Sequence, residues 1–214
     1  GISRLSLDLI FAIPGQSLTQ WQADLEQAIA FGPEHLSCYG LVYEPGTPLR
    51  GRLDRGEVER VDEDLEAKMY EWTIERLGQA GYEQYEISNW SRSDEACRHN
   101  LLYWNNRNWW PLGPSASGHL DGWRWRNLPK LGRYLETEGL SPIRDLERLD
   151  EDGRIGERLM MGLRCMAGFP QEAIEEMLAG EGGARRRPIM DKHLHDGLLE
   201  WSDGHLRLSE QGVL

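Results

Sequence analysis

The sequence predicts an α/β fold in its first part and a mainly helical fold in its last part. Two observations carry this prediction: apolar runs alternate with segments of helical periodicity over residues 1–88, and helical segments followed by a hairpin signal occupy residues 150–208. Strands that are joined by a helix are typical of a parallel sheet. The 214 residues, of which 39% are hydrophobic and 28% charged, are enough for one ordinary domain or two small ones.

Residues 1–88 show the pattern strand, helix, strand, helix, strand. The first strand is closed by Pro14-Gly15, and Ser17 with Gln20 forms a capping box that begins the first helix. The predicted strands are 3–13, 36–42 and 82–88, the predicted helices are 18–29 and 62–80, and a polar loop covers 44–56. Three parallel strands with helices on one side leave open sheet edges. Because the chain also starts without Met and runs straight into a strand, we expect it to be a fragment that begins partway through a longer α/β array.

The residue composition of the sequence changes after residue 90. Six of the nine tryptophans fall within residues 90–125, mixed with Asn, Arg and Gly. Further on, the sequence predicts helices at 150–166, 170–179 and 192–200, a loop at 181–187, and a hairpin around Asp203-Gly204. Helices followed by a hairpin give a winged-helix-like outline. We therefore divide the chain into a domain at residues 1–90 and a mainly helical domain at residues 91–214.

The charge balance and the cysteines exclude several classes of protein. The formal charge of −12 disfavours a non-specific nucleic-acid binder, which needs a basic surface. No apolar stretch reaches the length of about 18 residues that predicts a membrane span. The three cysteines, Cys38, Cys97 and Cys165, form no CxxC pair, so the chain alone shows no zinc ribbon and no cluster-binding loop. Their scattered spacing favours a reducing compartment, and we expect a cytoplasmic protein.

Three positions in the predicted strands and loops could contact a ligand. Strand alternation puts Asp8 on the face opposite the apolar residues, where an ionised carboxylate is costly unless a ligand group, a cation or a neighbouring arginine pairs with it. Gly40 either lets a flat ligand approach the backbone or is a small residue in a core strand. The loop 112–119, which contains Ser117, consists largely of small residues that leave room for a ligand or only allow a tight turn.

Between residues 97 and 104 the sequence reads Cys-Arg-His-Asn-Leu-Leu-Tyr-Trp. In a helix, His99 and Tyr103 share one face, and Asn100 and Trp104 share the adjacent face. An imidazole beside large aromatic surfaces suits a flat, metal-centred macrocycle with the histidine as axial ligand. The alternative is a hydrogen-bonded histidine in an aromatic core.

Several of these segments together resemble one family. The chain looks like the latter half of the HemN/HemW radical S-adenosylmethionine (SAM) proteins in six strings, which occur in the family's order: Leu7-Asp-Leu-Ile-Phe-Ala-Ile-Pro-Gly-Gln16, His35-Leu-Ser-Cys-Tyr-Gly40, Glu44-Pro-Gly-Thr-Pro48, Tyr85-Glu-Ile-Ser-Asn89, Cys97-Arg-His-Asn-x-x-Tyr-Trp104 and Leu112-Gly-Pro-Ser-Ala116. The likeness covers nearly the whole chain. The HNxxYW string and the EPGTP loop favour the HemW-type haem chaperone over the coproporphyrinogen III dehydrogenase branch.

The resemblance implies a partial (β/α)6 radical SAM barrel, of which this chain holds the last strands, followed by a HemN-type, mainly helical C-terminal domain. It implies that Asp8 contacts SAM, that Gly40 lies against the same cofactor, and that Ser117 matches a position near it. The CxxxCxxC loop that holds the family's [4Fe–4S] cluster is absent from this chain, so we expect SAM and the cluster only in the full-length protein. HemW-like proteins commonly carry His where this chain has Ser117, and here His119 lies two residues later.

The resemblance also implies a haem chaperone that binds haem and delivers it to respiratory haem proteins. His99 is the candidate ligand of the haem iron, and Asn100, Tyr103 and Trp104 are candidate haem contacts. The alternative is an enzyme, the oxygen-independent coproporphyrinogen III dehydrogenase of porphyrin biosynthesis. A winged-helix nucleic-acid module is a third class, which the charge disfavours. We expect no nucleic-acid partner and at most transient contact with membrane-associated partners, and a homodimer stays open.

Overall fold

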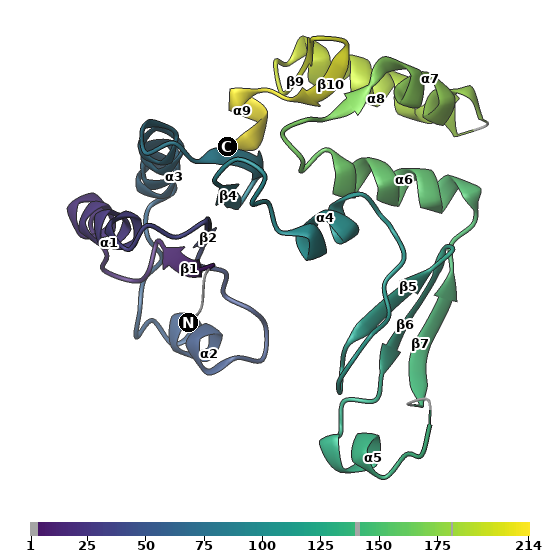
Figure 1. Cartoon of the computed structure of the whole chain (residues 1–214), viewed down its shortest axis with the longest axis horizontal. Helices are drawn as coiled ribbons and strands as arrows, with labels where there is room; N and C mark the ends of the chain where they lie inside the picture. The colour runs from purple at the N-terminus through teal and green to yellow at the C-terminus, as the bar shows by residue number, and fades with distance from the viewer. Residues whose placement is uncertain (1–3, 140–141, 181) are drawn as a thin grey trace. The chain divides into compact units, whose positions relative to one another are not determined.

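The computed structural model describes residues 4–139, 142–180 and 182–214 (Figure 1). Over these residues the chain forms two units. The first runs from the N-terminus to Cys97 and includes Val213–Leu214, and the second runs from Arg98 to Gly212. The boundary that we predict after residue 90 falls inside a strand of the first unit, β4 (Asn89–Ser91). None of the described helices is long and apolar enough to cross a membrane.

The first unit contains a four-stranded sheet with the strand order β1-β2-β4-β3. β1 (Ser6–Phe11) and β2 (His35–Gly40) are parallel, as predicted, but β4 pairs antiparallel with β2 on one side and with β3 (Glu83–Glu86) on the other. The three predicted strands therefore run in the same direction, as expected, but an additional strand that was not predicted, β4, lies between β2 and β3. The chain reverses after Glu86, where the buried Glu86 carboxylate accepts hydrogen bonds from the Ser88 backbone and the Asn89 side chain. This turn places β4 between β2 and β3.

Two long helices pack on the sheet of the first unit. α1 (Leu18–Ala30) begins with the predicted capping box of Ser17 and Gln20, and α3 (Glu63–Gln79) begins at the N-cap Asp62. The core between helices and sheet is apolar, and its fully buried members include Trp21, Leu25, Leu36, Met69, Leu77 and Trp90. The predicted loop 44–56 contains a short helix, α2 (Pro48–Asp54), because Thr47 caps its N-terminus and Pro48 occupies the first helical position.

The tryptophan-rich part of the chain forms a meander that the sequence analysis did not predict. β5 (Ser117–Leu120), β6 (Trp123–Asn127) and β7 (Ile143–Arg148) make an antiparallel sheet in that order. Asp121 and Gly122 join β5 to β6, and both have positive φ, 47° and 82°. This is the backbone of a tight hairpin turn, for which Asp-Gly is a strong sequence signal. The short helix α4 (Arg98–Trp104) precedes the sheet in sequence, and the short helix α5 (Leu131–Leu135) lies between β6 and β7.

The last part of the second unit has the predicted hairpin and the helices predicted at 150–166 and 170–179, whereas the helix predicted at 192–200 ends at His195 and residues 199–200 belong to the hairpin. α6 (Glu151–Gly162) and α7 (Gln171–Ala179) precede β9 (Leu199–Ser202) and β10 (His205–Leu208), which turn at Asp203-Gly204 and pair with β8 (Phe169–Pro170). The predicted loop over residues 182–187 is wrong, because α8 extends over Gly183–His195. The helix forms with Pro188 inside it. Residue 181 lies outside the described residues.

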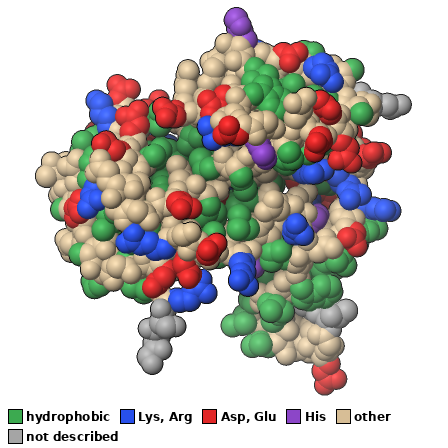
Figure 2. Space-filling model, turned by 45° about the horizontal axis from the view of Figure 1, so that its top comes forward, with side chains coloured by type: hydrophobic (Ala, Val, Ile, Leu, Met, Phe, Trp, Pro, Cys, Tyr) green, Lys and Arg blue, Asp and Glu red, His purple; other side chains and the backbone are tan. Residues whose placement is uncertain are grey.

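Exposed apolar side chains gather on the lobe of the second unit that carries α5. They include Leu112, Leu131, Leu135 and Ile143, and Leu112 is the most exposed at 82%. Figure 2 shows hydrophobic side chains over this lobe, whereas acidic and basic side chains are spread over other parts of the same face. The apolar core of the unit lies instead around Ile174, Met177, Leu178, Leu199 and Leu206, between the helices and the β8-β10-β9 sheet.

Candidate functional site

One face of the sheet in the first unit is polar. Ser6 lies opposite His35 and Asp8 lies opposite Ser37, so that these four side chains share a face. Ser37 Oγ donates a hydrogen bond of 2.7 Å to Asp8 Oδ1. The His35 ring contacts Ser6 Oγ through Nδ1 at 2.9 Å and the Tyr85 hydroxyl through Nε2 at 2.8 Å. Within the described ranges, a serine therefore holds the exposed Asp8 carboxylate, and no arginine pairs with it.

Burial sets the ionisation of two side chains in β2. It lowers the pKa of the His35 imidazole below the usual 6.5, although the negative charge of Asp8 opposes this shift. It also raises the pKa of the Cys38 thiol to about 12, and here the charge of Asp8 adds to the effect. Because a thiol is reactive only as its thiolate, Cys38 is a core residue and a poor nucleophile.

Gly40 and Asp8 lie on opposite faces of the same sheet. Gly40 is paired with Phe11, whose side chain belongs to the core, and a Cβ on Gly40 would lie 2.7 Å from a carboxylate oxygen of Glu66 in α3. Gly40 lines a small cavity of about 380 Å³ together with Cys38. Ser117, the third candidate SAM residue, is an exposed residue at the start of β5 in the second unit.

The HNxxYW string lies in a helix, α4, and its aromatic side chains begin a continuous series of ring contacts. His99 meets Tyr103 edge to face with ring centroids 4.8 Å apart, and Tyr103 meets Trp109 at 4.5 Å. The series ends with Trp109 and His119, whose rings are 4.9 Å apart. His99 is exposed, and its imidazole makes no hydrogen bond to any described residue. The ring nitrogens of His99 are therefore free to bind a ligand.

His119 is held in one orientation at the buried end of this aromatic series. Only 4% of the residue is exposed, and its Nδ1 lies 3.0 Å from the backbone carbonyl of Arg107. A carbonyl only accepts hydrogen bonds, so Nδ1 carries the proton. Nε2 has no hydrogen-bond partner among the residues that the structure describes.

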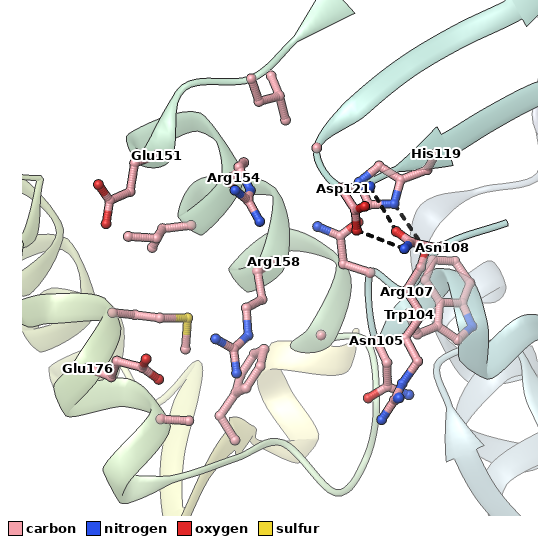
Figure 3. Close-up of a pocket in the computed structure, with 18 of the residues that line it drawn as sticks. Trp104, Asn105, Arg107, Asn108, His119, Asp121, Glu151, Arg154, Arg158 and Glu176 are labelled. Carbon is pink, nitrogen blue, oxygen red and sulfur yellow. Dashed lines mark hydrogen bonds between the residues drawn. The ribbon is translucent and has the colours of Figure 1, made fainter.

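A cleft of about 1150 Å³ lies in the second unit beside this cluster (Figure 3). Trp104 and His119 border it on one side, and α6 contributes Arg154 and Arg158 on another. Phe169 adds an aromatic wall. Trp104 is the last residue of the HNxxYW string, so the motif helix and the cleft share a side chain. Clefts with apolar walls and a few placed polar groups are the usual form of small-molecule sites.

Comparison with known proteins identifies the family. A family model, HemN C-terminal domain, matches residues 149–214. The whole chain is 35% identical over 216 residues to the Heme chaperone HemW of Mycobacterium tuberculosis, of which it covers 53%, and 30% identical to the Heme chaperone HemW of Bacillus subtilis, of which it covers 57%. The chain belongs to the HemN/HemW-like radical SAM family. It spans about half the length of these curated relatives.

The HemN/HemW-like fold is also supported by a solved structure. Coproporphyrinogen III oxidase (HemN) from Escherichia coli, described as a radical SAM enzyme, matches the whole of this chain over 53% of its own length with a TM-score of 0.76. The two sequences are only 17% identical, so this likeness concerns the fold. It agrees with the predicted fold class, an α/β part from the end of a radical SAM barrel followed by the HemN-type domain.

This HemN/HemW-like chain shows no place for an iron–sulfur cluster in its described residues. Across residues 4–139, 142–180 and 182–214, no group of three or more His, Cys, Asp or Glu side chains is arranged to hold a metal ion. Cys38 is buried, and Cys97 and Cys165 are half-buried. The side chains described here do not fit a [4Fe–4S] cluster.

The sequence analysis missed the arginines that line the cleft. Arg154 and Arg158 lie four residues apart in a segment that was correctly predicted as a helix, so their shared face could have been seen. The position of Trp104 and His119 beside that face could not have been seen in the sequence. These two residues lie roughly 35 to 55 positions before the two arginines. The four motif residues share α4, whereas the three candidate SAM residues are divided between the two units.

Proposed function

We propose that the protein is a haem chaperone, which binds haem at α4 and passes it to a respiratory haem protein. The proposal rests on His99. Its imidazole is exposed, has no hydrogen-bond partner in the described part of the chain, and meets the Tyr103 ring edge to face. A neutral imidazole nitrogen is a common axial ligand of haem iron. The names of the relatives that are 30–35% identical support the proposal.

The aromatic series explains how α4 could hold a cargo that must later be released. Tyr103 and Trp109 offer ring surfaces beside His99, against which a flat macrocycle gains apolar contact. The same residues are exposed or half-buried, so that an acceptor protein can reach the bound haem. We propose that coordination comes from His99 alone, and that the acceptor's own ligand replaces it.

In the whole protein, we propose that SAM contacts Asp8 and the backbone of Gly40, which both belong to the first unit. The support for Asp8 is its geometry: Oδ1 accepts from Ser37, while Oδ2 is available to a hydroxyl or amine donor of the cofactor. Gly40 presents its backbone at the end of β2, beside a small cavity. Bound SAM would supply the radical chemistry of the family, and Asp8 would orient it.

A haem titration tests the chaperone proposal. Haem added to the protein is expected to give a shifted Soret band that saturates, and His99→Ala is expected to abolish the shift because the iron loses its ligand. The control is His195→Ala, which removes an exposed histidine at the end of α8. An unchanged Soret shift in His99→Ala would disprove the assignment of His99.

The full-length protein separates the chaperone from the enzyme. If the full-length protein, reconstituted with SAM and a cluster, converts coproporphyrinogen III into its decarboxylated product, the chaperone proposal fails. We expect no such product, because the relatives with 30–35% identity are named as haem chaperones and the match to the oxidase, at 17% identity, concerns the fold.

A further inference from the structure

The cleft of the second unit contains guanidinium groups that the fold does not use. Arg154 and Arg158 project from one face of α6, and neither forms an ion pair or a hydrogen bond with a described residue. Arg158 lies only near the Phe169 ring, with its guanidinium carbon 5.9 Å from the ring centroid. By contrast, Arg124 on the neighbouring strand β6 is paired with both Glu147 and Glu157. Arg154 and Arg158, two of the four arginines that line the cleft, are therefore available to a ligand.

The acidic residues around the cleft do not neutralise these arginines. Asp121 Oδ1 accepts a hydrogen bond of 2.8 Å from the Asn108 amide, and Asp150 Oδ1 accepts one of 2.8 Å from the Gly153 backbone as the N-cap of α6. Glu151 and Glu176 also line the cleft, but both are exposed and neither lies within ion-pair distance of a described arginine. Figure 3 shows the Glu151 and Arg154 side chains pointing in different directions.

Part of the remaining wall of the cleft is apolar. Trp104, Phe169 and Met177 supply aromatic and aliphatic surface, beside polar side chains such as Asn105 and Asn108. The volume of about 1150 Å³ is larger than the roughly 300–1,000 Å³ of most small-molecule sites, which points to a large ligand. A ligand that fits has an apolar ring system and carboxylates at one edge.

We propose that the cleft binds the propionate edge of haem, with Arg154 and Arg158 pairing with the two carboxylates. This inference rests on the proposed function and adds a second part to the haem site, which Trp104 connects to the motif helix. Arginine is suited to this task because its planar guanidinium donates two parallel hydrogen bonds to a carboxylate. His99 then provides the coordination of iron, and the arginine pair provides affinity and orientation.

The test compares two ligands and three proteins. Haem and haem dimethyl ester, in which both propionates are esterified, are titrated into the wild type, into Arg154→Gln/Arg158→Gln, and into the control Arg133→Gln/Arg144→Gln. The control removes the same charge from exposed positions of α5 and β7. We expect the cleft variant to bind haem at least about tenfold more weakly than the wild type and the control, since charge-assisted hydrogen bonds are lost.

Two further readouts separate carboxylate binding from a general loss of structure. The Soret maximum of haem bound to the cleft variant should equal that of the wild type, because the iron ligand is unchanged. The dimethyl ester should bind the wild type more weakly than haem and should bind the wild type and the cleft variant equally. Equal affinity of the wild type for haem and for the ester, or equal haem affinity of the cleft variant and the wild type, would overturn the inference.

The outcomes also distinguish this inference from the proposed function. If the wild type binds no haem, both fail. If His99→Ala abolishes the Soret shift while Arg154→Gln/Arg158→Gln binds haem like the wild type, the chaperone proposal stands and the arginine assignment falls. If the cleft variant does not fold, the comparison of haem with its ester on the wild type decides alone.

Discussion

The His35 imidazole is held between Ser6 and Tyr85 with both ring nitrogens engaged. A neutral imidazole has one donor and one acceptor nitrogen, and a hydroxyl group can pair with either. Protonation would make both nitrogens donors and would place a charge in a site where only 7% of the residue is exposed. For this reason burial lowers the pKa of His35, although Asp8 opposes the shift.

The lowered pKa predicts how stability depends on pH. As the pH drops below 6.5, His35 becomes protonated in the unfolded chain before it becomes protonated in the folded chain. The free energy of unfolding therefore falls as the pH drops through this range. We expect the melting temperature to decrease between about pH 7.5 and about pH 5.5, and His35→Gln to remove part of this decrease. Melting curves of the wild type, His35→Gln and the surface control His195→Gln measure it. Equal pH slopes for the wild type and His35→Gln would contradict the prediction.

At the scale of elements, close backbone approach fixes how β8 meets β10. Gly168 stands just before β8 with a φ of +64°, and a Cβ there would lie 2.2 Å from the Leu206 carbonyl oxygen in β10. A side chain at this position is thus strained by the backbone conformation and blocked by another strand. Gly132, inside α5, has no atom within 4 Å of its added Cβ and an ordinary helical φ.

These two glycines give a matched pair of substitutions. Gly168→Ala should lower the free energy of unfolding by about 1–3 kcal/mol or more, because both the strain and the clash must be relieved. Gly132→Ala should leave it unchanged or raise it by up to about 1 kcal/mol, because alanine favours a helix. Denaturant unfolding followed by circular dichroism compares the two. A Gly168→Ala variant as stable as the wild type would show that the β8 contact is not needed.

At the scale of the whole molecule, the distribution of charge disfavours the hypothesis that the protein is a winged-helix module that binds nucleic acid. The chain has 36 acidic and 24 basic residues, and Figure 2 shows acidic and basic side chains interspersed on one face. Arg185 and Arg186 on α8, where a winged helix would place basic residues, both pair with Asp152. The single carboxylate of Asp152 therefore offsets part of their charge.

This balance predicts that the protein does not bind duplex DNA. Nucleic-acid binding depends on neutralising phosphates with unpaired Lys and Arg side chains, and it weakens steeply with salt. We expect no shifted band in a gel-retardation assay at low salt, with a basic DNA-binding domain as the positive control. Retention that disappears as salt is raised would revive the nucleic-acid hypothesis.

The amount of structure that could be predicted from the sequence differs between parts of this chain. The alternation in β1, the capping box of α1 and the hairpin at Asp203-Gly204 are local patterns, and local patterns predicted them correctly. The insertion of β4 between β2 and β3 was not predictable in this way, because strand order depends on which distant edge a strand meets. The β5–β7 meander was missed although Asp121-Gly122 signalled its turn and Trp and Arg alternate along β6, two local signals that together could have indicated a hairpin.

The candidate site likewise has features that follow from local sequence patterns and features that depend on contacts between distant segments. By itself the sequence determined the family, the helix that carries His99 and Tyr103, and the polar face that carries Asp8, because each depends on residues close together in the chain. Only the tertiary structure decided that Gly40 faces away from Asp8 and that Trp104, His119 and the α6 arginines border one cleft. A cleft is a property of surfaces that packing brings together, and the periodicity of a single segment contains no information about its neighbours in space.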